Sequence, residues 1–130
     1  MNNNQMRDEQ QALQNHVDHI AQTLTAGMTY KEAELDHEEH GAEPTDLISG
    51  YDYLSDVLEI KYITENDDDD DDEGEYLGAR VLVSFGGPNI WIDTRTCTVE
   101  GYWWGDEATA TYTDEMNLHG TCQELYEMGA

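Results

Sequence analysis

The fold of this chain can be predicted from residues 76–104, which read YLGARVLVSFGGPNIWIDTRTCTVEGYWW. Apolar side chains alternate along residues 76–85, which is the two-residue period of a strand with one face on a core. The Gly-Gly-Pro sequence at 86–88 turns the chain into a second strand at 89–94, and a polar turn leads to a third at 97–104. Tight connections of this kind join antiparallel neighbours, so the stretch predicts a β-meander.

A further strand is expected before this stretch, over residues 57–64. There Leu58, Ile60 and Tyr62 alternate with Glu59 and Lys61, again with a period of two. Residues 106–112 also alternate, but the pattern is ambiguous. The expected sheet therefore has about four strands (57–64, 76–85, 89–94, 97–104).

Helices are expected at both ends of the chain. Residues 1–27 form an amphipathic pattern that ends at Gly27 as a C-terminal cap, with one apolar stripe made by Met6, Leu13, Val17, Ile20 and Leu24. This stripe can pack on the rest of the chain or on a second copy, so a homodimer is possible. A C-terminal helix is expected from Thr113 to Met128. Two shorter helices are expected at 30–40 and from Thr45 to Leu54.

These elements predict a single α+β domain spanning residues 1–130, with an antiparallel sheet covered by helices. The first residues show no secretory signal pattern, and no window is apolar enough for a membrane span. We therefore expect a cytoplasmic protein, in the host cell cytoplasm if it is phage-encoded. Cys97 and Cys122 are expected to be reduced thiols.

Acidic residues dominate the composition, with 30 Asp and Glu against 5 Lys and Arg and a net charge of -25. Nineteen of the carboxylates lie within residues 32–75, where Lys61 is the one base. Such a surface repels nucleic acid and anionic membranes and attracts the basic grooves of nucleic-acid-binding proteins. Direct nucleic-acid binding and membrane binding are therefore not expected.

The run Asp67–Asp72 is expected to be part of a flexible acidic loop at residues 66–75. An extended chain advances about 3.3 Å per residue, and one DNA strand carries a charge about every 3.4 Å, so the two have similar linear charge densities. Carboxylates on folded elements are better placed than this loop to imitate a regular array of phosphates. The expected partner-binding residues are Glu32, Glu34, Asp36, Glu38, Glu39, Asp46, Asp52, Asp56, Glu59, Asp67, Asp68, Asp69, Asp70, Asp71, Asp72, Glu73 and Glu75, with Trp103 and Trp104 as aromatic contacts.

The two tryptophans are neighbours on one expected strand and should point to opposite faces of the sheet. They cannot both face inward, and an exposed tryptophan is often an interface anchor. Packing against an overlying helix is the alternative for either ring.

Patterns typical of catalysis or metal binding are weak. The pairs His16/His19 and His37/His40 have a spacing that places two imidazoles on one side of a helix, and the sequence alone leaves metal binding by either pair undecided. No third ligand is indicated, so no metal or other cofactor is expected. Neither cysteine has a base beside it in the sequence, and no catalytic residue is assigned.

In size, charge and lack of a catalytic signature, the chain resembles the small acidic phage- and plasmid-encoded proteins that block restriction enzymes or CRISPR complexes by mimicking DNA. The sequence FGGPNIWIDT at 85–94, followed by VEGYWWG at 99–105, looks like a core found in uncharacterised mobile-element proteins. This resemblance implies a β core and a mobile-element origin, and it transfers no functional residues.

The sequence therefore predicts a non-enzymatic inhibitor or modulator of the anti-CRISPR or anti-restriction type. It would bind the basic surface of a DNA- or RNA-binding host protein and exclude DNA by steric competition. The alternative is an acidic adaptor that binds a partner through its apolar N-terminal helix, with the acid serving solubility.

Overall fold

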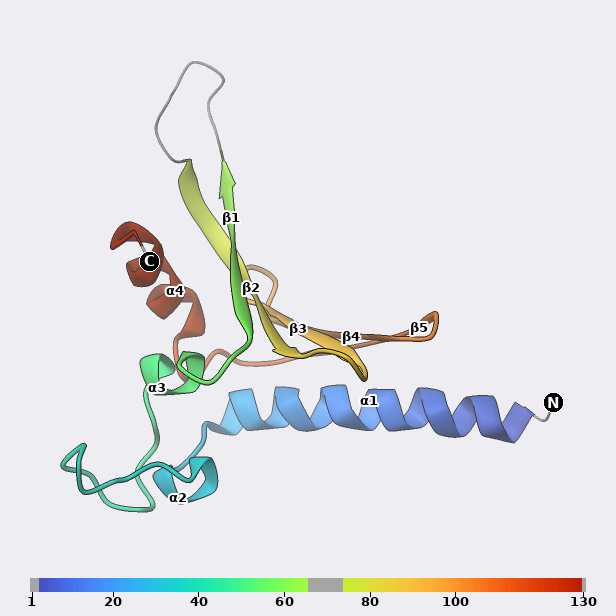
Figure 1. Cartoon of the computed structure of the whole chain (residues 1–130), viewed down its shortest axis with the longest axis horizontal. Coiled ribbons are helices and arrows are strands. Elements are labelled where there is room, and N and C mark those ends of the chain that lie inside the picture. Colours follow the sequence, from blue (N-terminus) through green and yellow to red (C-terminus); the bar gives the residue numbers. More distant parts are fainter. Residues whose placement is uncertain (1–2, 66–73, 130) are drawn as a thin grey trace.

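The computed structural model describes residues 3–65 and 74–129. It is an α+β structure with one five-stranded antiparallel sheet and helices at both ends (Figure 1). The strands lie in the sheet in the order in which they occur in the chain. The elements are α1 (Asn3–Ala26), α2 (Tyr30–Ala33), α3 (Gly50–Leu54), β1 (Glu59–Glu65), β2 (Glu75–Ser84), β3 (Asn89–Asp93), β4 (Thr98–Trp103), β5 (Asp106–Thr111) and α4 (Leu118–Glu127).

The meander is confirmed, but the expected number of four strands is too low. The missing strand is β5, which pairs along its length with β4. Its inward residues are the small Ala108 and Ala110, so the large apolar side chains that usually reveal a strand are absent. Small residues suit this position because α1 packs closely over β4 and β5.

From Leu13 onward, the apolar stripe of α1 packs against the sheet of its own chain. Leu13, Val17, Ala21 and Leu24 are all core residues. Gly101 of β4 lies beneath them, and a Cβ at this position would come within 2.6 Å of Val17 Cγ2. Only glycine therefore permits this close approach of α1 to the strand. Neither α1 nor any other helix in the described part of the chain combines the length and apolarity needed to cross a membrane.

The two short helices and the C-terminal helix begin or end at different residues from those expected. Residues 30–40 are helical only to Ala33, because Glu34 has a left-handed backbone with φ of 58°. The helix expected from Thr45 begins at Gly50 instead, after the N-cap Ser49. The C-terminal helix begins at Leu118 rather than near Thr113, capped by Asn117.

The sheet has one covered face and one open face. The inward row across the five strands is Ile60, Val81, Ile92, Val99 and Ala110. Along β2, the alternation over residues 76–85 predicts that Phe85 faces inward like Val81 and Val83. Instead, β2 ends at Ser84 after an irregularity in its pairing with β3, and Phe85 is 73% exposed. Trp91 lies on the open face beneath two cations, with Lys61 Nζ at 5.3 Å and Arg80 Cζ at 4.8 Å from its ring.

Candidate functional site

Five of the carboxylates expected to bind a partner lie in residues 34–46, which we call the acidic loop: Glu34, Asp36, Glu38, Glu39 and Asp46. It lies beyond the C-terminal end of α1 (Figure 1). Backbone hydrogen bonds attach its C-terminal end to α2, since the N–H of Tyr30 donates to the carbonyl of Asp46 and that of Lys31 to the carbonyl of Pro44, both at 3.0 Å. The next residue, Leu47, forms an isolated β-bridge with Thr29. The loop is thus closed at its base.

Asp36 supports the backbone inside the acidic loop. Its Oδ1 accepts hydrogen bonds from the N–H of Glu38 at 3.0 Å and of Glu39 at 3.4 Å. Glu34, Glu38 and Glu39 are exposed. Their carboxylates therefore project into solvent from a hydrogen-bonded backbone, although this part of the chain is not the helix expected from the sequence.

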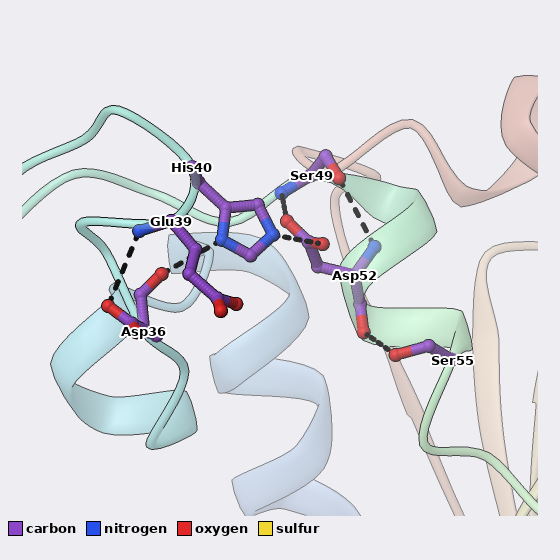
Figure 2. A network of polar contacts seen from close by, with 6 residues as sticks. All are labelled: Asp36, Glu39, His40, Ser49, Asp52 and Ser55. Carbon is purple, nitrogen blue, oxygen red and sulfur yellow. Dashed lines mark hydrogen bonds and ion pairs between the residues drawn. The ribbon is translucent and has the colours of Figure 1, made fainter.

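His40 links the acidic loop to α3. Its Nδ1 lies 2.9 Å from the backbone oxygen of Asp36, and its Nε2 lies 3.4 Å from Asp52 Oδ1 (Figure 2). Asp52 is itself held in a capping box, in which its N–H donates to Ser49 Oγ at 3.1 Å and its Oδ2 accepts from the Ser49 N–H at 3.3 Å. The Tyr30 ring also packs on His40, with 5.2 Å between ring centroids. The imidazole thus joins three segments of the chain.

The environment of His40 favours its protonated form. The hydrogen bond to the Asp36 carbonyl is the main cause that raises the pKa of His40 above its ordinary value. Partial burial lowers this pKa, whereas the negative charges of Asp52 and Glu39 raise it further. Because the pKa of His40 is higher in the folded than in the unfolded chain, its contribution to stability is complete below a pH of about 6. That contribution is lost as the pH rises through the folded-state pKa.

We expect Asp52→Asn to lower the pKa of His40, because it removes the charge that faces Nε2. The measurement is an NMR titration of the His40 ring signals in both proteins. Asp56→Asn is the matched control, since it removes an equal charge four residues further along the chain. Equal lowering by both substitutions would mean that total charge, and not the His40–Asp52 contact, determines the pKa.

The other expected carboxylates on folded elements have varied surroundings. Glu32 completes the capping box of α2, where hydrogen bonds from the Thr29 backbone N–H and hydroxyl lower its pKa. Asp46 Oδ2 accepts from the Glu43 N–H at 2.9 Å. Asp56 and Glu59 are exposed between α3 and the start of β1.

The predicted flexible loop at 66–75 is only partly within the described residues. Asp67–Asp72 and Glu73 lie outside them. Glu75 is not in a loop, because it begins β2 and pairs directly with Glu65 of β1. Like charges directly opposite one another destabilise a strand pair, so the described end of the β1–β2 hairpin concentrates negative charge.

Trp103 and Trp104 are not brought together with the acidic loop. They lie at the β4–β5 turn, beside the N-terminal half of α1, whereas the acidic loop lies beyond its other end (Figure 1). A hydrogen bond of 2.8 Å from Gln10 Nε2 to the Glu107 carbonyl fixes the hairpin beside the helix. Both tryptophans are exposed, Trp103 by 42% and Trp104 by 86%. The aromatic and acidic residues therefore form two separate surfaces.

Few of the carboxylates in the described residues have an ion-pair partner. Ion pairs occur at two places in the described residues, His40 with Asp52 and Arg80 with Glu100 at 3.6 Å. The second pair lies on the open sheet face beside Trp91. No Lys or Arg among the described residues forms an ion pair with a carboxylate of the acidic loop.

The two histidine pairs, which were considered as metal ligands, have different surroundings. His16 and His19 lie exposed on α1, but His37 and His40 are not on a helix, and His37 Nδ1 contacts the Ala42 carbonyl at 3.0 Å. No group of three or more His, Cys, Asp or Glu among residues 3–65 and 74–129 is arranged to hold a metal.

Both thiols are free, as expected. Cys122 lies in α4, where burial raises its pKa to about 11. Cys97 lies in the turn before β4 rather than in a strand, with φ of 54°, and partial burial raises its pKa as well. Both thiols are therefore protonated at neutral pH, the less nucleophilic form.

Two features were not found by sequence reasoning. One is the His40–Asp52 contact, whose partners are twelve residues apart and on different elements. The other is the set of three residues formed by Trp91, Lys61 and Arg80. The strand alternation set Lys61 apart from the inward Ile60 and Tyr62, but neither the face of Trp91 nor the lateral register that makes the three residues neighbours was predicted.

Comparison of the chain with protein-family models, curated proteins and solved structures finds no match. Its function must therefore be inferred from its charge and geometry.

Proposed function

We propose that this chain is a non-enzymatic inhibitor or modulator that binds the basic nucleic-acid-binding surface of a host protein, of the CRISPR effector or restriction enzyme class. The observation that carries the proposal is the acidic loop, in which exposed carboxylates extend from a hydrogen-bonded backbone without Lys or Arg partners among the described residues. In this position they take the place of phosphates in the basic groove.

Two physical effects support this function. A net charge of -25 attracts a basic groove over a distance of about 10 Å at 0.1 M salt and accelerates encounter. A backbone already held by Asp36 and His40 loses less conformational freedom on binding than an unordered segment would. Binding then excludes DNA sterically.

The adaptor alternative has less support. It needs the apolar stripe of α1 to be available to a partner, but Val17 and Leu24 are buried under the sheet of the same chain. The same burial covers Leu13, Val17 and Leu24, on which a homodimer through this stripe would depend.

The proposal is tested by competition. A labelled DNA duplex is bound to a purified restriction endonuclease and, separately, to a Cas9-type effector, and the chain is added at increasing concentration. We expect displacement of the duplex from at least one enzyme, with the apparent affinity falling steeply between about 50 and 200 mM salt. Catalytic activity of the chain is not required. Failure to displace the duplex from either class at low salt would contradict the proposal.

A further inference from the structure

The second surface, at the β4–β5 turn, contains a cavity that the acidic loop does not explain. Its volume is about 280 Å³, near the lower end of the range of about 300–1,000 Å³ for small-molecule sites. It is lined by Glu9, Ala12, Leu13 and His16 of α1, together with Pro88, Trp103, Trp104 and Asp106. A neighbouring hollow shares Trp103, Trp104 and Asp106 with this cavity and adds Glu107. The size suits one long side chain.

Trp104 occupies a position that is unfavourable for tryptophan. The turn has two residues, Trp104 and Gly105, between the paired Trp103 and Asp106. Both have positive φ, 52° and 86°, which is the pattern of a type I′ turn that favours Asn-Gly. Tryptophan here adopts a left-handed backbone and also leaves a large apolar ring in water. Strained residues of this kind occur preferentially at sites of binding.

The chemistry of the cavity matches a guanidinium group. Indole faces attract cations, and arginine stacks on them through its planar group. Carboxylates at Glu9 and Asp106 lie on the same lining and can accept hydrogen bonds from such a group. The open face of the sheet offers a precedent within the chain, since the guanidinium of Arg80 lies over the ring of Trp91.

We propose that the cavity between α1 and the β4–β5 turn binds an arginine side chain of the basic partner, stacked on Trp104 and paired with Glu9 or Asp106. The assignment of the arginine to such a partner rests on the proposed function. Binding of a guanidinium group in the cavity does not depend on that function.

The test uses Nα-acetyl-arginine-amide as the probe and its uncharged citrulline analogue as the control ligand. Binding is followed through the indole N–H signals of the three tryptophans in NMR spectra. We expect saturable shifts of Trp103 and Trp104 with the arginine compound, with the shift of Trp91 small, and little change with the citrulline compound. Equal binding of both compounds, or shifts that do not saturate, would overturn the proposal.

Trp104→Asn is the informative variant, because it creates the Asn-Gly turn that this hairpin favours. It should fold at least as stably as the original chain, while arginine binding weakens by about 2- to 30-fold, the range expected for loss of a cation–π contact. Asp106→Asn should also weaken binding. Phe85→Ala is the control, since it removes an exposed aromatic ring that lines neither hollow. Unchanged binding in Trp104→Asn would contradict the assignment.

The two proposals can fail separately. Displacement of DNA from an enzyme without arginine binding at the tryptophans would leave the proposed function standing and reject the cavity assignment. Saturable arginine binding without displacement of DNA would support the cavity assignment and reject the proposed function.

Discussion

Replacing Leu24 with alanine is expected to lower the free energy of unfolding by about 2–5 kcal/mol, the usual cost of removing a large side chain from a packed core. Leu24 is 1% exposed and lies in α1 among the residues that cover the sheet. Because small domains are stable by only about 5–15 kcal/mol, the loss is a large part of the total. Urea denaturation followed by tryptophan fluorescence measures it.

Leu58→Ala is the matched control for this prediction. It removes the same atoms from a side chain that is 61% exposed, so we expect a change within about 0.5 kcal/mol. If the two variants unfolded at the same urea concentration, α1 would not pack on the sheet as described. Deletion of residues 1–27 would remove Leu13, Val17, Ala21 and Leu24 from the core at once and is expected to unfold the chain.

Substituting Glu34, Glu38 and Glu39 together with glutamine is expected to weaken binding to a nucleic-acid-binding enzyme by about 3- to 150-fold. This range assumes about 0.2–1 kcal/mol for each exposed ion pair lost. Asp36 and Asp52 remain in place, so the hydrogen bonds that hold the acidic loop are kept. The duplex competition assay at constant salt measures the change.

A second triple variant tests whether the position of the charge matters. This variant combines Asp67→Asn, Asp68→Asn and Asp69→Asn. It removes an equal number of negative charges, but from the aspartate run. We expect a smaller loss of binding than for the glutamine variant. Equal losses would mean that total charge alone drives binding and that the acidic loop has no special role.

The sheet could largely be predicted from the sequence because its signals are local. Gly-Gly-Pro at 86–88 and the alternation on either side define β2 and β3 within a few residues. β5 was missed because Ala108 and Ala110 carry no strong apolar signal, and the helix expected at 30–40 ends early because Glu34 adopts a left-handed backbone. No local pattern predicts that reversal for a glutamate.

The candidate sites could be predicted only as lists of residue types. The number of carboxylates and the pair Trp103-Trp104 are visible in the sequence. The sequence does not show that the carboxylates and the tryptophans lie at opposite ends of α1, because this separation depends on where the helix lies on the sheet. The contact of His40 with Asp52 depends in the same way on how the acidic loop packs beside α3.

The α+β class, the antiparallel meander and the strongly acidic character of this protein follow from its sequence, because periodicity, turn chemistry and charge are properties of neighbouring residues. Which carboxylates extend from a hydrogen-bonded backbone depends on the three-dimensional packing of the chain. This packing also places Glu9 of α1 and Asp106 of β5 around one cavity. These residues are 97 positions apart, and only the packing of a helix on a sheet brings such distant residues together.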